Sequence, residues 1–222
     1  MTARPALPGD AESIADLLAY IPVRPGVKQD LLARLSDPGR RYHGLHHVAL
    51  LWQRHRVLGA GLPVTGAPWH ALLACAVGFH DAVHDPQRRD SEARSAALWR
   101  AARPALDPAG VEWVAGTILA TADHLGARPE PGMDGAAWAA RAWMLDLDLT
   151  PLGEARAVFE ANTALLREEY AHLSDAAWTE GRCGFLRRLA AHGGLYRSPA
   201  IAAVFDGPTR ANLVRETRAA PC

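Results

Sequence analysis

The chain has 222 residues, and its 24 Lys and Arg balance 24 Asp and Glu, so its formal net charge is zero. This balance creates no field of one sign, which disfavours a nucleic-acid polymer or a membrane surface as partner. No apolar stretch reaches the roughly 18 residues that span a bilayer, and residues 1–10 lack a secretion signal's apolar core. Three cysteines without Cys-x-x-Cys spacing, Cys75, Cys183 and Cys222, fit a reducing compartment. We predict one cytoplasmic domain over 1–222; the sequence does not determine the oligomeric state.

Apolar residues recur at helical spacing along most of the chain. The first such segment opens at Asp10, carries Ile14 and Leu17, and stops before Pro22. No segment alternates with a period of two, and Val and Ile are sparse beside Ala and Leu, so no sheet is expected. The Pro- and Gly-rich loops are too short to link domains. The pattern predicts an all-α single domain with helices over 10–21, 27–35, 43–58, 68–85, 91–106, 111–125, 136–148, 153–172, 175–192 and 209–217.

A histidine and an aspartate follow the most apolar of these segments. The run 71–79 leads directly into His80-Asp81, and burying two such groups is costly unless both find partners. A divalent metal is one partner that satisfies both an imidazole and a carboxylate. His84 and Asp85 each follow by four residues, so on a continuing helix the two pairs stack and indicate a metal site with outer hydrogen-bonding partners. The alternative is that Asp81 or Asp85 caps the next segment.

Further candidate ligands lie upstream and downstream of this pair. His43 and His47 are four residues apart, which places both on one face of a helix, although surface or capping histidines show the same spacing. Asp146 and Asp148 interrupt an apolar run and require partners, such as a metal or the N-terminus of the next helix. His124 ends a predicted helix, where it either joins the site or simply favours the helix dipole.

Motifs for a side-chain nucleophile or a nucleotide-binding loop are absent. The chain has no Gly-x-Ser-x-Gly, no Gly-x-x-x-x-Gly-Lys-Ser/Thr and no Gly-rich dinucleotide loop. Water activated by a metal is therefore the expected nucleophile.

The order of these residues resembles a known superfamily. His47, then His80-Asp81, then Asp148 resembles the HD superfamily of metal-dependent phosphohydrolases, which are all-helical. Residues from about 40 to 216 resemble a bacterial subgroup of predicted HD phosphohydrolases, through the motifs Arg41-Tyr42-His43-x-x-x-His47, Phe79-His80-Asp81-Ala-Val-His-Asp85-Pro86, Asp146-x-Asp148-Leu149-x-x-Leu-Gly153 and Arg167-Glu-Glu-Tyr170. The subgroup often has Tyr at the position of His84 and Asn at that of Gly44. The resemblance implies an HD-type bundle with a motif core at about 40–153 and C-terminal helices over 154–218.

The resemblance also implies roles for individual residues. The metal ligands would be His47, His80, Asp81 and Asp148. Tyr42-His43-x-x-x-His47 and His80-Asp81-x-x-His84 are similar to cyclic-nucleotide phosphodiesterases, which makes His43 the general acid. Asp148 is preferred to Asp146 because it precedes Leu149, as the last metal aspartate does in those enzymes. Four residues would bind a second metal, bridged by the catalytic Asp81, or hydrogen-bond to the ligands: His84, Asp85, His124 and Asp146.

The expected function is hydrolysis of a small phosphomonoester or phosphodiester, nucleotides included, by metal-activated water. The sequence does not choose among Mn, Fe, Zn, Co, Ni and Mg as the divalent ion. Arg88 and Arg89 are candidate phosphate contacts, with a solvated charge run as the alternative. Two other functions stay open. The spare histidines His84 and His124 also suit an HD-type di-iron oxygenase, and the third possibility is a non-catalytic metal- or ligand-binding module.

Overall fold

The computed structural model describes residues 9–64 and 66–219, so the expectations for residues 1–8 and for Cys222 lie outside it. This part of the chain contains helices and no strand, which confirms the predicted all-α class. None of the helices described has both the length and the apolar character to cross a membrane. The elements are α1 (Asp10–Tyr20), α2 (Pro25–Leu35), α3 (Leu45–Leu58), η1 (Gly59–Gly61), α4 (Ala67–Phe79), α5 (Ser91–Ala101), α6 (Pro108–Ala120), η2 (Thr121–Asp123), α7 (Gly135–Leu149), η3 (Thr150–Gly153), α8 (Arg156–Glu169), α9 (Asp175–Ala191) and α10 (Pro199–Ala219).

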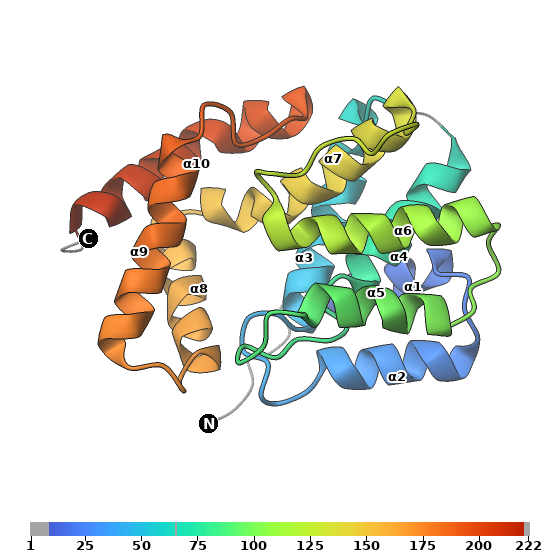
Figure 1. The fold of residues 1–222 in the computed structure, drawn as a ribbon, viewed down its shortest axis with the longest axis horizontal. Helices are drawn as coiled ribbons and strands as arrows, with labels where there is room; N and C mark the ends of the chain where they lie inside the picture. Colours follow the sequence, from blue (N-terminus) through green and yellow to red (C-terminus); the bar gives the residue numbers. More distant parts are fainter. Residues whose placement is uncertain (1–8, 65, 220–222) are drawn as a thin grey trace.

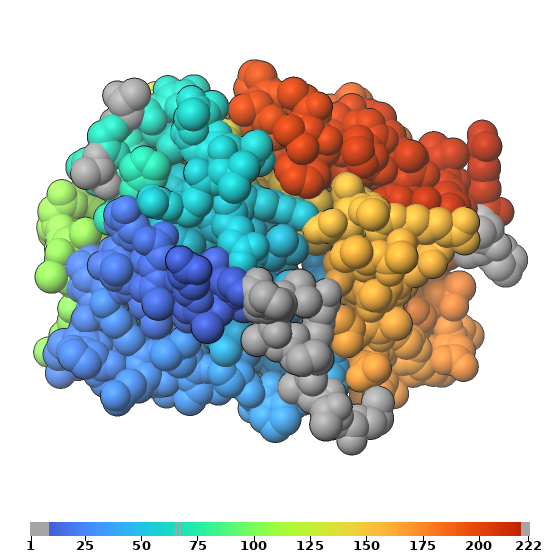
Figure 2. Space-filling model, turned by 180° about the vertical axis from the view of Figure 1, so that it is seen from behind, coloured from blue at the N-terminus to red at the C-terminus, as the bar shows by residue number. Residues whose placement is uncertain are grey.

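The helices form a larger body with a smaller group beside it. Helices α1 to α6 make the larger body, and α8, α9 and α10 lie together on one side of it, in orange to red (Figures 1 and 2). Within the body α1 packs on α3 and α4, and α6 packs on α4 and α5. Helix α7 contacts α3, α4 and α6 and runs into η3, which packs against α10. It therefore links the two groups.

The core centres on α3, α4 and α7. Leu73 to Val77 of α4 are all fully buried, because the helix is apolar on every side after His70 and there has no face suited to water. Trp52 of α3 and Trp143 of α7 are also fully buried and are among the largest side chains of the core. His47 lies in the first turn of α3, His80 directly follows α4, and Asp148 lies in the last turn of α7. Packing of these three helices in the core therefore fixes where the three polar side chains lie.

Two predicted helix boundaries next to the candidate ligands are wrong. Helix α4 ends at Phe79, so the stacked rows expected over 80–85 do not form. The amides of Val83 and Asp85 instead donate hydrogen bonds to the hydroxyl oxygens of α5 serines, at 2.9 and 3.2 Å between nitrogen and Oγ. Helix α3 begins only at Leu45, and His43 lies in the preceding turn.

Helix α10 also departs from prediction, since it begins at Pro199 rather than Thr209 and continues through Pro208. An internal proline removes a helix hydrogen bond and costs about 3 kcal/mol in an isolated helix. Ile201 and Leu213, on either side of it, are buried in the core. Tertiary packing thus overrides the local preference.

Candidate metal centre

Three helices bring four candidate ligands close together, with Asp148 next to the group formed by His47, His80 and Asp81. His47 comes from α3, His80 and Asp81 follow α4, and Asp148 lies in the last turn of α7. His47 Nε2 lies 3.0 Å from Asp148 Oδ1 and 3.3 Å from His80 Nε2. His80 Nε2 lies 3.0 Å from Asp81 Oδ2 and 3.7 Å from Asp148 Oδ1. Atoms that share one tetrahedral zinc are separated by roughly 3.3–3.6 Å, so these residues fit a divalent ion after small shifts.

The orientation and charge of His80 favour a cation. Its Nδ1 donates to the carbonyl of Val77 at 2.9 Å, which turns Nε2 toward the other ligands. Burial lowers the pKa of His80, but the carboxylates of Asp81 and Asp148 outweigh it and raise this pKa to about 9. Although burial raises the pKa of Asp148, His80 and the hydrogen bonds from His124 and His47 hold it well below its usual range. Without metal, a neutral-pH site therefore holds one imidazolium between two carboxylates.

This charge state predicts how metal affinity depends on pH. His80 Nε2 must lose its proton to bind an ion, and its raised pKa of about 9 means that the proton is present at neutral pH. Apparent affinity should therefore rise roughly tenfold per pH unit between about pH 7 and 8.5, as one proton is released per ion. Competition against a chelator of known affinity at each pH measures this slope, and an affinity independent of pH would contradict it.

The two aspartates of α7 face different neighbours. Asp148 Oδ2, the oxygen turned from His47, lies 2.8 Å from His124 Nε2. Asp146 is fully buried and accepts hydrogen bonds from the backbone amides of Arg197 and Ser198 at 2.8 and 2.6 Å. Asp146 therefore anchors the start of α10, whereas Asp148 points into the candidate centre.

His43 is held by Glu169, which lies in the motif Arg167-Glu-Glu-Tyr170 but had no predicted role. Glu169 Oε1 accepts the backbone N–H groups of residues 41, 42 and 43 at 2.8, 2.8 and 2.9 Å. Its Oε2 lies 2.6 Å from His43 Nδ1. Burial lowers the pKa of His43, but Glu169 and Asp81 raise it overall, which favours the imidazolium near neutral pH. One sequence signal existed, since Glu169 lies on the buried stripe of α8 that also carries Phe159 and Asn162.

The predicted residues His84 and Asp85 lie near the candidate centre but do not belong to it. His84 belongs to a cluster with His43 and Glu169, whereas Asp81 clusters with His47 and His80. Asp85 Oδ1 accepts the backbone N–H of Gln87 at 3.0 Å and so stabilises its own turn.

Two arginine predictions and one unpredicted arginine differ in their surroundings. Arg88 and Arg89 are both exposed, and Arg88 forms an ion pair with Asp90 at 2.6 Å. Neither lines the cavity at the centre. Arg40 was not predicted, and its guanidinium donates to the carbonyls of His43, Asp81 and Ala82. It thereby ties the turn before α3 to the turn after α4.

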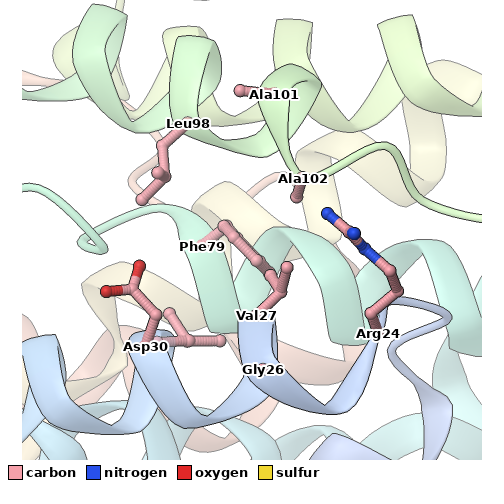
Figure 3. Close-up of a pocket in the computed structure, with 9 residues that line it drawn as sticks. Arg24, Gly26, Val27, Asp30, Phe79, Leu98, Ala101 and Ala102 are labelled. Atoms are coloured by element: carbon pink, nitrogen blue, oxygen red, sulfur yellow. The ribbon is translucent and has the colours of Figure 1, made fainter.

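A cavity of about 550 Å³ opens beside the centre. Its polar side contains His43, His47, Asp81, His124 and Asp148. Its other side comes from α8, α9 and nearby turns, with the unpredicted side chains Leu166, Tyr170, Trp178, Arg182 and Phe185. A separate cavity of about 470 Å³ lies between α2, α4 and α5 (Figure 3). That second cavity has no histidine in its lining and Asp30 as its one carboxylate, so it is a poor metal site.

The structure thus brings His43, His47, His80, Asp81 and Asp148 together, with His124 bound to Asp148. The geometry shows that buried histidine and carboxylate groups could hold a metal ion. No protein-family model, curated protein or solved structure matches the chain.

Proposed function

We propose that the chain is an HD-type metal-dependent phosphohydrolase that cleaves a small phosphomonoester or phosphodiester. The observation that carries this proposal is the convergence of His47, His80, Asp81 and Asp148, with contacts of 3.0–3.8 Å, beside a cavity that His43 also lines. A divalent ion bound there would lower the pKa of a coordinated water and neutralise charge on a phosphate. Imidazole and carboxylate ligands together admit Mn, Fe, Zn, Co, Ni or Mg.

His43 would act as the general acid. Its Nδ1 is engaged by Glu169 at 2.6 Å, which leaves the Nε2 proton for the cavity. The raised pKa of His43 favours the protonated ring, which could pass its proton to the leaving oxygen. Glu169 would fix the ring, because its other oxygen is held by three backbone amides.

The far side of the cavity supports a substrate with a planar organic group. Tyr170, Trp178 and Phe185 give it aromatic surface, on which a nucleobase could stack. Arg182 lines the same side, donates to Thr163 Oγ1 at 3.2 Å, and has no carboxylate within ion-pairing distance among the residues that the structure describes. A guanidinium without such a partner suits a phosphate. Nucleotides are therefore the first substrates to test.

A hydrolysis screen tests the proposed function. Metal-free protein is reloaded with each candidate ion and offered nucleotides, cyclic nucleotides, sugar phosphates and nitrophenyl phosphates. We expect metal-dependent phosphate or alcohol release by the wild type and none by His80→Ala prepared alongside. Release that is equal in both proteins, or that needs no metal, would reject this assignment.

One contact favours the oxygenase as a second candidate. His124 Nε2 lies 2.8 Å from Asp148 Oδ2, so Asp148 has an imidazole at each of its oxygens and could bridge two ions. Iron-loaded protein that consumes oxygen with an organic substrate, and hydrolyses no phosphoester, would support this candidate. Binding without turnover in either assay would instead indicate a ligand-binding module.

A further inference from the structure

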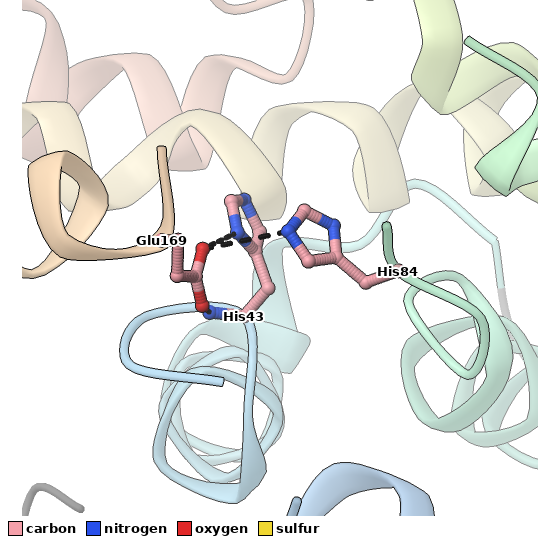
Figure 4. A group of neighbouring side chains, drawn as sticks. All are labelled: His43, His84 and Glu169. Carbon is pink, nitrogen blue, oxygen red and sulfur yellow. Dashed lines mark hydrogen bonds and ion pairs between the residues drawn. The ribbon is translucent and has the colours of Figure 1, made fainter. Parts of the chain in front are cut away.

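A second group of metal-ligating side chains lies beside the first. His43 from the turn before α3, His84 from the turn after α4 and Glu169 at the end of α8 point toward one another (Figure 4). Their ligand atoms all lie within 4.8 Å of one another. The two imidazole rings pack with centroids 4.2 Å apart and planes tilted by 31°.

The carboxylate of Glu169 is arranged to serve both histidines. Three backbone amides hold Oε1, so Oε2 is left facing the imidazoles. It lies 2.6 Å from His43 Nδ1 and 3.4 Å from His84 Nε2. These separations bracket roughly 3.3 Å, the spacing of nitrogen and oxygen atoms that share one tetrahedral zinc. An ion between them would require the 2.6 Å contact to lengthen by about 0.7 Å.

His84 supplies the observation that points to a ligand. Its Nε2 is buried, and its contact with Glu169 Oε2 at 3.4 Å is too long or too poorly aligned to be a hydrogen bond. A buried polar atom whose hydrogen-bonding capacity is not met is unfavourable and requires an explanation. A bond to a metal ion would satisfy this nitrogen, whereas the hydrogen bond between His43 and Glu169 leaves it unused.

The cluster can be reached without passing through the main cavity. His43 lines the cavity of about 550 Å³, whereas His84 and Glu169 line another of about 400 Å³ on a different side. Asp37 and Asp85 lie in the lining of this smaller cavity together with three arginines, Arg34, Arg40 and Arg94. Arg40 is engaged by backbone carbonyls, and Arg34 is paired with Asp30 at 2.8 Å.

We propose that His43, His84 and Glu169 form a second metal site, which binds a transition metal ion such as Zn²⁺ more weakly than the four-ligand centre does. Two imidazoles and a carboxylate are ligands that zinc accepts, and three protein ligands bind less tightly than four. One consequence rests on the proposed function. An ion on His43 Nδ1 takes the place of the Nδ1 proton, so the ring is no longer an imidazolium. Its remaining Nε2 proton is then a weaker acid, so excess metal should inhibit hydrolysis.

Equilibrium dialysis against Zn²⁺ tests the site itself. The wild type should bind a second equivalent at high free zinc, and His84→Phe should lose only that one. Phenylalanine keeps the ring that packs on His43 but offers no nitrogen. His192→Gln, in the link between α9 and α10, is the control for adventitious histidine binding and should retain both equivalents. A wild type that stops at one equivalent, or a His84→Phe variant that binds two, overturns the proposal.

The zinc dependence of hydrolysis tests the consequence. Wild-type activity should rise and then fall as zinc increases, whereas the activity of His84→Phe should rise and stay level. An equal fall in both proteins would show that the inhibition does not arise at His84. Absence of any hydrolysis would count against the proposed function alone, because dialysis still decides whether the second site exists.

Discussion

His80→Ala is expected to abolish metal-dependent hydrolysis and to leave the centre without its ion. His80 Nε2 contacts ligand atoms of His47, Asp81 and Asp148 within 3.7 Å, and the residue is only 2% exposed. Removing it leaves an incomplete set of ligands that no neighbouring group can complete. Asp81→Ala should behave in the same way. Metal content per chain and kcat/KM, measured on the same preparations, check both variants.

The same substitution should destabilise the metal-free protein. Without the His80 side chain, the largely buried carboxylates of Asp81 and Asp148 lose the imidazolium that lies between them. Breaking a buried ion pair in this way costs about 3 kcal/mol, which denaturant unfolding in the presence of a chelator would measure. His192→Gln serves as the matched histidine control and should unfold like the wild type. Full metal occupancy in His80→Ala would remove this residue from the centre.

His43→Ala is expected to keep the metal but to slow hydrolysis by roughly 10²- to 10⁴-fold, the usual contribution of a general acid. The reason is that His43 bonds to Glu169 at 2.6 Å and has a raised pKa, so it holds a proton beside the cavity. The loss should be large for an alkyl phosphoester, whose leaving oxygen needs that proton. It should be small for a nitrophenyl ester, which leaves as a stable anion.

Comparison of kcat for these two substrates is therefore the informative measurement. Glu169→Gln gives a matched second variant, because its amide keeps an oxygen for the backbone N–H groups but removes the charge that holds the imidazolium. It should show the same dependence on leaving group with a smaller loss. Equal losses of His43→Ala activity on both substrates would assign His43 to positioning or to metal binding instead.

Local pattern was enough to predict the all-helical class and the buried histidine and carboxylate groups that could hold a metal ion. Helix α4 is apolar from Ala71 to its end and becomes the central buried helix, and the polar pair that follows it was recognisable as costly without a partner. The separation of Asp146 from Asp148 follows from the helix period, because residues two apart on α7 point in nearly opposite directions.

What the sequence could not predict depends on contacts between distant segments. Glu169 lies 126 residues after His43, yet its carboxylate holds the backbone amides and the imidazole of the turn before α3. Serines of α5 similarly replace the helix hydrogen bonds beyond Phe79. Helix α3 thus begins later and helix α4 ends earlier than predicted, and His84 meets His43 rather than stacking beneath His80. Hydrophobic periodicity likewise does not predict that Tyr170, Trp178 and Phe185 line the cavity, since this depends on how α8 and α9 pack.

Metal content of purified Asp148→Asn and Asp146→Asn, compared with the wild type, tests the central claim most directly. Asp148 Oδ1 lies 3.0 Å from His47 Nε2, and a neutral amide there is a poorer ligand for a divalent ion. Asp146 instead holds the amides before α10 at 2.6 and 2.8 Å, contacts that an amide oxygen can still accept. We predict that Asp148→Asn loses its ion and that Asp146→Asn retains a full equivalent. Loss of the ion from Asp146→Asn together with its retention in Asp148→Asn would contradict the ligand set.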